Sequence, residues 1–337
     1  MNLANRIEAF SKLGSKINQI SDTEFQEILG NVKNLNPWFT EENIKLAIAG
    51  ITKLLEKNNL EKWTASYDLN PKQIKIIGVA MAGNIPMVGF HDLLCILISG
   101  HHCTAKLSSQ DSFLIKWLAE TLITLEPEFS SRIIFQERLN HVDAMIATGS
   151  DNTARYFEYY FRKIPHIIRK NRSSCAIILG EESAEELTTL GKDVFAYFGL
   201  GCRNVSKLYV PEGYNFIGML DSWISFHDII HHHKYCNNYD YQKSILLVNS
   251  IPFLDTGYVL LTQNESLVSP ISTLYYETYK DQNDLSQKLN MHRDKLQCIA
   301  SSNGWYKESV PFGKVQFPEV WDYADNVDTL KFLQFKE

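Results

Sequence analysis

The sequence lacks several features that would assign it to a simple class. Its longest apolar runs, such as residues 87–100, are too short and too interrupted to span a bilayer, so we predict no transmembrane segment. It has no low-complexity stretch and no internal repeat. Basic residues are outnumbered, 33 against 39 acidic ones, for a formal net charge of −6. That balance argues against a nucleic-acid partner.

The cysteine pattern excludes two further classes. None of the six cysteines stands in a Cys-X-X-Cys pair, so neither a disulfide framework nor a cysteine zinc site is indicated. We interpret them as reduced thiols and predict a cytoplasmic location. The opening residues, MNLANRIEAFSKLG, are amphipathic and lack the apolar centre of a signal peptide.

What remains is typical of a globular protein, with 45% hydrophobic and 21% charged residues and a length that favours about two domains. Residues 1–60 have helical spacing and predict a supporting layer. From Ile74 onward, short apolar strands alternate with helices, which predicts a mainly parallel sheet covered on both faces. The expected strands are 74–81, 104–107, 132–136 and 144–147, and the expected helices are 87–99, 112–125 and 151–161.

The alternation restarts near Arg169 and predicts a second α/β domain. Together the two halves predict two doubly wound, Rossmann-like domains with a helical N-terminus and a C-terminal arm. We expect the boundaries at 1–170, 171–312 and 313–337, and the arm ends in a strand-like run that could pack on another subunit. The expected strands here are 175–179, 206–210, 258–261, 271–279 and 296–300, with helices at 183–198, 239–248 and 282–289.

The most informative stretch is Ala196–Pro211, AYFGLGCRNVSKLYVP. Two glycines directly before Cys202 let the backbone turn sharply and allow a ligand to approach closely. A thiol at a junction between a helix, a loop and a strand can reach a cleft, and its reactivity depends on its thiolate fraction. Most free cysteines are simply small buried residues, and this stretch alone leaves both interpretations open.

Three further stretches follow predicted strands of the first domain, where ligands of parallel sheets bind. They are the tight loop Ala82-Gly83-Asn84-Ile85-Pro86, the end of the next strand at Lys106 with Ser108 and Ser109 behind it, and the turn Thr148-Gly149-Ser150. Pro86 suits the first turn of a helix. Each stretch also has an ordinary interpretation, as a turn residue, a surface lysine or a helix cap.

In their order and spacing, these motifs resemble the aldehyde dehydrogenase superfamily, and within it the LuxC-type fatty acyl-CoA reductases. The Gly-Asn-Ile-Pro loop is similar to the superfamily's Asn-Phe-Pro loop, and Ala147–Ser150 is similar to its Phe-Thr-Gly-Ser. Ser206-Lys207 follows Cys202 where the superfamily has Ser-Arg after its nucleophilic cysteine. The stretch from Val310 onward resembles the closing stretch of the reductase branch.

The departures from the superfamily are informative. Dehydrogenases that hydrolyse an acyl-enzyme carry a general-base glutamate in Leu-Glu-Leu-Gly-Gly, whereas Ile167–Ser174 has no acid. Ser109 replaces the glutamate that contacts the adenosine ribose, which leaves room for the 2′-phosphate of NADPH. The glutamate of Glu-X-Phe-Gly-Pro is missing from SPISTLYYETY, at 269–279, and the N-terminal region is short for this family.

The resemblance implies NADPH-dependent reduction of a fatty acyl-CoA or acyl carrier protein thioester to the fatty aldehyde, through a covalent acyl-Cys202 intermediate. The Asn84 amide and the Cys202 backbone N–H would stabilise the oxyanion. A helix N-terminus would hold the pyrophosphate. The cofactor-binding set implied by the resemblance is Ala82, Gly83, Lys106, Ser108, Ser109, Thr148, Gly149 and Ser150.

Several points stay open at the level of sequence. His91, His101, His102 and His141 are all candidates for the general acid. We predict no metal site, because the consecutive histidines 231–233 do not share a face of a helix or strand. The resemblance implies an acyl-transferase or acyl-ligase partner and a homo-oligomer. The alternatives are an oxidative NAD(P)-dependent aldehyde dehydrogenase, or a degenerate, non-catalytic member that acts as a binding subunit.

Overall fold

A computed structural model describes residues 1–149 and 151–335. The chain forms two compact units, Met1–Asn171 together with Phe317–Glu337, and Arg172–Gln316. The first division therefore falls one residue beyond the expected boundary at 170. Much of the expected C-terminal arm is grouped with the first unit. Among the described residues, no helix has the length and apolar content needed to cross a membrane.

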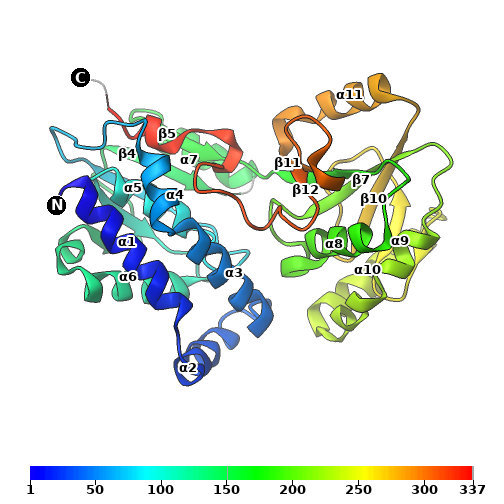
Figure 1. The fold of residues 1–337 in the computed structure, drawn as a ribbon, viewed down its shortest axis with the longest axis horizontal. Coiled ribbons are helices and arrows are strands. Elements are labelled where there is room, and N and C mark those ends of the chain that lie inside the picture. Colours follow the sequence, from blue (N-terminus) through cyan, green and yellow to red (C-terminus); the bar gives the residue numbers. More distant parts are fainter. Residues whose placement is uncertain (150, 336–337) are drawn as a thin grey trace. The chain divides into compact units, whose positions relative to one another are not determined.

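The first unit opens with four helices, as the sequence predicts (Figure 1). Three of them begin at a capping side chain: Asn2, Ser21 and Thr40 each accept a hydrogen bond from a backbone N–H in the first turn. Their apolar stripes face inward, and α1 packs against α3 and α6. The bounds are α1 Leu3–Asn18, α2 Asp22–Lys33, α3 Glu41–Leu54 and α4 Lys57–Thr64.

The five-stranded sheet of the first unit is wholly parallel in the order β3-β2-β1-β4-β5. Its strands are β1 Ile76–Ala80, β2 His102–Lys106, β3 Ile133–Phe135, β4 Ala144–Thr148 and β5 His166–Arg169. The helices that follow them are α5 Phe90–Ile98, α6 Ser112–Leu125 and α7 Asp151–Phe161. The parallel sheet is confirmed, but β5 was not predicted, because four residues are too few to show a period.

One helix boundary was predicted wrongly. We expected a helix from Met87 with Pro86 in its first turn, whereas α5 begins at Phe90. Met87 has φ of +58°, a left-handed conformation that cannot continue a right-handed helix. The loop after β1 is therefore longer than predicted.

The second unit has a seven-stranded sheet in the order β12-β11-β6-β7-β10-β9-β8, parallel except for the β8/β9 pair. Alternate residues of β6 enter two cores: Ala176 packs toward α8, and Cys175 and Ile177 pack toward α11. Both faces are therefore covered, and the prediction of two doubly wound α/β domains is confirmed. The strands are β6 Ser173–Ile177, β7 Val205–Pro211, β8 Leu254–Asp255, β9 Leu260–Gln263, β10 Thr273–Tyr279, β11 Leu296–Ser301 and β12 Val310–Pro311.

The helices of this unit are α8 Ala184–Phe195, α9 Ile217–Ser222, α10 His233–Val248 and α11 Gln282–Met291. Two short 3₁₀ helices matter below, η2 Ala196–Gly199 and η3 Ile224–His231. The helix predicted to reach residue 198 ends at Phe195, because Tyr197 and Phe198 adopt left-handed conformations.

The strand-like run predicted at the C-terminus was wrong. Residues Thr329–Phe332 form a short helix, α12, whose N-cap Asp328 accepts a hydrogen bond from Lys331 N. Arg169, at the end of β5, holds this segment to the first unit: it donates to Ala324 O over 2.6 Å and to Thr329 Oγ1 over 3.0 Å. The segment therefore completes the first unit's own core.

Candidate functional site

Most of the predicted cofactor residues lie at one edge of the first sheet. Ala80 at the end of β1 is paired with Lys106 at the end of β2 and with Ala147 near the end of β4. The residues that follow these strands therefore leave the sheet at the same carboxyl edge. The order in which strands are added to the sheet also reverses here. Strands β2 and β3 lie on one side of β1, and β4 and β5 lie on the other. Such a switch point is where open α/β sheets bind their ligands.

The loop after β1 interlocks with the turn after β2. A Cβ atom on Gly83 would lie 2.5 Å from Ser108 Oγ and 3.1 Å from Asp111 N. Contacts this short exclude any side chain at position 83. Gly83 and Ser108, which both belong to the predicted cofactor set, therefore lie close together, and their role toward a cofactor stays a prediction.

Asp111 was missed by the sequence analysis, which treated it as part of a helix cap. It is 3% exposed, and its Oδ2 accepts a hydrogen bond of 2.6 Å from Met87 N. Its Oδ1 is buried and has no hydrogen-bond partner among the described residues. Burial raises the pKa of Asp111 to about 7. This carboxyl group therefore holds the loop that carries Asn84.

The polar side chains at this edge face solvent. Asn84 and Ser109 are exposed, and the Lys106 side chain is 51% exposed with its Nζ 4.0 Å from Glu137 Oε2. An exposed ion pair at this distance is weak, so a phosphate can compete for the lysine. Thr148 is the last residue of β4, Gly149 follows it on the N-terminal side of α7, and Ser150 lies outside the described residues.

Cys202 lies at the opposite kind of edge in the second sheet, because it precedes β7 instead of following a strand. It is partly exposed. The backbone leading to it passes through three successive left-handed residues, Tyr197, Phe198 and Gly199, with φ of 51°, 58° and 77°. Non-glycine residues seldom adopt this conformation, which persists only where surrounding contacts enforce it.

Asn204 forms hydrogen bonds to the backbone on both sides of these three residues. It is 2% exposed, and its Oδ1 accepts a hydrogen bond of 2.8 Å from Gly201 N. Its Nδ2 donates to Ala196 O over 2.7 Å and to Asp193 O over 3.1 Å. One amide therefore closes the turn around Cys202 and satisfies the carbonyls at the end of α8. An asparagine two residues after a glycine–cysteine pair was the signal for this role in the sequence.

Ser174 fixes the cysteine's backbone from the other side. Its Oγ donates to Cys202 O over 3.0 Å and accepts from Cys298 N over 3.2 Å. The thiols of Cys95, Cys103 and Cys175 are fully buried, and burial raises their pKa values. These three are therefore poor nucleophiles compared with a partly exposed thiol.

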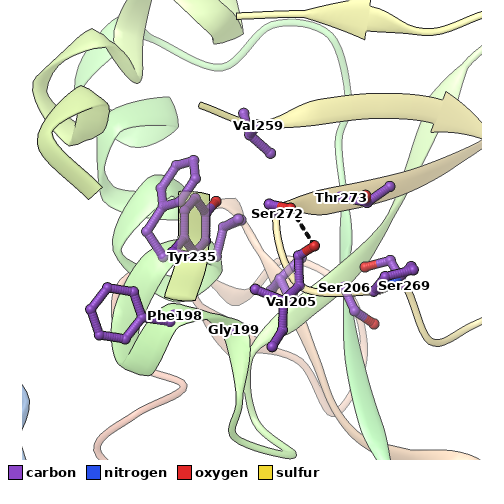
Figure 2. A pocket seen from close by; sticks show the side chains of 13 residues that line it. Phe198, Gly199, Val205, Ser206, Tyr235, Val259, Ser269, Ser272 and Thr273 are labelled. Atoms are coloured by element: carbon purple, nitrogen blue, oxygen red, sulfur yellow. Dashed lines mark hydrogen bonds between the residues drawn. The ribbon is translucent and has the colours of Figure 1, made fainter. Parts of the chain in front are cut away.

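A pocket of about 30 Å³ lies beside the cysteine turn in the second unit (Figure 2). The turn residues Phe198 and Gly199 line it, together with Val205 and Ser206 at the start of β7 and the stretch 269–273 before β10. That stretch stands where the superfamily carries Glu-X-Phe-Gly-Pro. The volume holds one or two water molecules and is too small for a long acyl chain as the side chains now stand.

Two of the four candidate histidines have evident structural partners. His91 Nε2 lies 2.8 Å from Val320 O. His101 Nδ1 accepts from Lys75 N over 3.1 Å, and its Nε2 lies 3.0 Å from Leu333 O. Burial lowers the pKa of His101, which favours the neutral ring. His102 begins β2 and His141 precedes β4, so both lie toward the amino edge, away from Lys106 and Thr148.

The stretch Ile167–Ser174, which lacks the general-base glutamate, has a structural role. Arg169 is 2% exposed and forms an ion pair of 2.6 Å with Asp92 in α5. The basic residue of Ser206-Lys207 is also structural. Lys207 is fully buried and donates to Glu277 Oε2 over 2.6 Å and to Glu265 O over 2.7 Å.

Comparison with known proteins supports the fold and the resemblance. No family model matches the sequence. A long-chain acyl-protein thioester reductase from Aliivibrio fischeri is 23% identical over 168 residues, and the match spans 44% of this chain but only 35% of that protein.

Solved aldehyde dehydrogenases share the architecture. A Bacillus cereus aldehyde dehydrogenase in complex with NAD⁺ matches with a TM-score of 0.66 at 12% identity, over 89% of this chain and 72% of that one. A P. syringae indole-3-acetaldehyde dehydrogenase matches with a TM-score of 0.67 at 12% identity, over 92% and 74% of the two chains. The chain thus has the aldehyde dehydrogenase fold and is similar in sequence to a LuxC-type reductase.

Proposed function

Because the chain has the fold of the aldehyde dehydrogenases and resembles an acyl-protein thioester reductase, we propose that it reduces fatty acyl thioesters to fatty aldehydes with NADPH. The observation that carries the proposal is the built turn around Cys202. Asn204 and Ser174 hold this partly exposed thiol's backbone, while three other cysteines are buried. The donor would be a fatty acyl-CoA or an acyl carrier protein.

In the first step, the Cys202 thiolate attacks the thioester carbonyl carbon. A bond forms between Cys202 Sγ and that carbon, and the bond to the sulfur of CoA or of the carrier protein breaks and releases its thiol. Negative charge develops on the carbonyl oxygen. We assign its stabilisation to the Cys202 backbone N–H and the Asn84 amide, and a donor of this kind contributes on the order of 3 kcal/mol.

The carboxyl edge of the first sheet fits a dinucleotide. Gly83 lets the loop after β1 pack directly on the turn after β2, and Lys106 offers an exposed cation. Thr148 and Gly149 lead into a helix N-terminus that favours phosphate. Ala82, Ser108 and Ser109 complete the proposed binding set. Bound there, the reduced nicotinamide would supply a hydride to the carbonyl carbon of the acyl group on Cys202. The bond between that carbon and Cys202 Sγ then breaks, which releases the aldehyde and returns Cys202 as the thiolate.

The chain's own residues favour reduction over hydrolysis. The stretch Ile167–Ser174 contains no carboxylate, and the buried Arg169 within it is engaged by Asp92 and Thr329. We infer that an acyl-enzyme here has no general base to activate water, so it persists until it is reduced. An oxidative dehydrogenase would need that base.

We also propose a cytoplasmic, homo-oligomeric protein that receives its acyl group from an acyl-transferase or acyl-ligase partner. Partly exposed thiols such as Cys202 and Cys236 are compatible with a reducing compartment. The partner classes rest on the resemblance alone.

Intact-mass spectrometry tests the proposal directly. The protein is mixed with a long-chain acyl-CoA, with and without NADPH, beside the variants Cys202→Ala and Cys298→Ala. We expect an acyl adduct on the wild type and on Cys298→Ala that disappears when NADPH is added, and none on Cys202→Ala. Cys298 is the matched control because it is also partly exposed and shares Ser174 with Cys202.

Other outcomes separate the alternatives. Reduction of NADP⁺ by free aldehyde without CoA, with no acyl adduct, would favour an oxidative dehydrogenase. An adduct on Cys202→Ala would contradict the assigned nucleophile. No adduct from either acyl-CoA or acyl carrier protein, and no NADPH binding at millimolar concentration, would favour a non-catalytic binding subunit.

A further inference from the structure

Three potential metal ligands lie together on η3, and none of them belongs to the proposed cofactor set or to the cysteine turn. His227 Nδ1 and His231 Nε2 each lie 3.7 Å from Asp228 Oδ1. The ligand atoms of the three residues all lie within 4.8 Å of one another. The three side chains are exposed, at 53%, 73% and 93% for His227, His231 and Asp228.

The fold explains why these three residues share a face. The neighbouring residues Phe226, Ile229 and Ile230 pack against the core of the second unit. Because these three apolar residues are directed toward the core, the polar residues between them lie on the outer face. In a 3₁₀ helix, residues three apart lie above one another, which places Asp228 and His231 on one face. The neighbouring His227 ring reaches the same place, with its centroid 5.9 Å from that of His231.

The core also holds this helix in place. Phe226 stacks on Phe195 with ring centroids 5.0 Å apart, directly before His227. The His227 ring itself lies edge-on to the buried Tyr258, with centroids 5.7 Å apart. The backbone and one ligand ring are therefore positioned by packing that does not depend on an ion, which reduces the ordering that binding requires.

We propose that His227, Asp228 and His231 form a binding site for a divalent transition-metal ion of the zinc, cobalt and nickel class. Two imidazole nitrogens and one carboxylate oxygen are donors that suit these ions better than Mg²⁺ or Ca²⁺. With metal–ligand bonds of about 2.0–2.1 Å, tetrahedral ligands lie about 3.4 Å apart. The two distances of 3.7 Å are close to that, and exposed side chains can close the difference.

The proposed site differs from the histidine tract that the sequence analysis considered. Histidines 231–233 were judged as one tract, and that tract does not converge. His232 instead caps α10 by accepting a hydrogen bond from Tyr235 N, and its ring lies 4.4 Å from that of Phe198. Only His231 joins the cluster, and its partners lie upstream on the same helix.

Metal titration of the full chain without a polyhistidine tag tests the proposal. Co²⁺ is the probe, followed by its visible absorption and by calorimetry, with Mg²⁺ as the negative control. We expect one Co²⁺ per chain. Since loss of an outer-shell partner already costs about 10–100-fold in metal affinity, His227→Ala or His231→Ala should weaken binding by at least about 10-fold. His233→Ala, which changes a neighbouring histidine outside the cluster, should bind as the wild type does.

The design keeps folding and catalysis apart from metal binding. The substituted side chains are exposed, so the variants should unfold at the same temperature as the wild type when melting is followed by circular dichroism. Cys202→Ala should bind Co²⁺ as the wild type does, whatever becomes of the proposed reductase activity. Absence of Co²⁺ binding, wild-type Co²⁺ affinity in both ligand variants, or an equal loss of affinity in His233→Ala would each overturn the site.

Discussion

The two units place their candidate residues at opposite kinds of sheet edge. In the first unit, Gly83, Lys106 and Thr148 lie at or after the carboxyl ends of strands. In the second, Cys202 precedes β7 and so belongs to an amino end. The rule that ligands bind at carboxyl ends therefore finds the proposed cofactor site and misses the proposed nucleophile. Under the proposed function, the first unit would bind the cofactor and the second would carry out the covalent step.

In each unit, a buried aspartate accepts a hydrogen bond from the backbone of a loop and so fixes that loop. The two aspartates differ in how many of their carboxyl oxygens have a hydrogen-bond partner. Asp193 accepts from Gly313 N over 2.6 Å and also from the Val315 backbone. Asp111 accepts from Met87 N over the same distance, but its Oδ1 is left without a partner among the described residues. Burial raises both pKa values to about 7. The incompletely satisfied carboxyl is the one beside the proposed cofactor loop.

The largest expected effect tests whether the first unit depends on its C-terminal segment. Arg169→Met removes the buried ion pair with Asp92 and the bonds to Ala324 and Thr329. Because Asp92 is left with an uncompensated charge, we expect a loss of about 3–5 kcal/mol in unfolding free energy. Hydrogen exchange of residues 317–335 should rise, while the second unit keeps its protection. Equal loss in both units would show that they do not fold separately.

The second prediction uses the two aspartates against each other. A carboxyl whose folded pKa is raised above its unfolded value destabilises the fold progressively as pH rises from about 4 to about 7. For each aspartate the loss is at most about 4 kcal/mol. Asp111→Asn keeps an acceptor for Met87 N and removes the charge. We therefore expect it to be more stable than the wild type at about pH 8, with a smaller difference at about pH 5.

Urea unfolding at these two pH values measures the effect, and Asp193→Asn is the matched control in the second unit. The two variants should give similar stability gains, but only Asp111→Asn should alter NADPH affinity. If Asp193→Asn changed the NADPH affinity as much, the inference that Asp111 fixes the proposed cofactor loop would be refuted. A pH-independent difference for Asp111→Asn would show that the carboxyl is not buried as described.

The sequence predicted the architecture well because its elements have strong local signals. The strand predicted at 74–81 and the helix predicted at 112–125 were found within a few residues, as β1 and α6. The failures have physical reasons. The C-terminal run is apolar enough to resemble a strand. It is helical because Asp328 caps its first turn and Arg169 donates a hydrogen bond to Thr329. Tertiary contacts decided the outcome there.

The candidate site was predicted by residue type but not by environment. The sequence pointed to Cys202 and Lys106, whose roles stay predictions. It could not reveal that Asn204 closes the cysteine turn or that Asp111 reaches Met87, because those contacts depend on side-chain direction in the folded chain. Nor could it separate His231 from the two histidines that follow it.

The third prediction concerns the turn in the second unit. Asn204→Ala removes the acceptor for Gly201 N and the donors to Ala196 and Asp193. Since several buried backbone groups lose partners, we expect a loss of about 2–3 kcal/mol. Single-turnover acylation of Cys202 should slow more than tenfold, while NADPH affinity stays unchanged. Asn204→Asp, which retains the acceptor, should recover part of the acylation rate; if it recovered none, the Gly201 contact would not be what positions the cysteine.

The smallest expected effect tests the binding task of the first unit alone. Lys106 is half exposed and only weakly paired with Glu137, so its loss should barely affect folding. Lys106→Met should weaken NADPH binding by about tenfold, equivalent to about 1.4 kcal/mol, by removing a phosphate contact. Glu137→Gln should strengthen it slightly, because the competing carboxylate is gone. Acylation of Cys202 by acyl-CoA without NADPH should proceed at the wild-type rate in both variants. If Lys106→Met slowed that acylation, binding and covalent chemistry would not be divided between the two units.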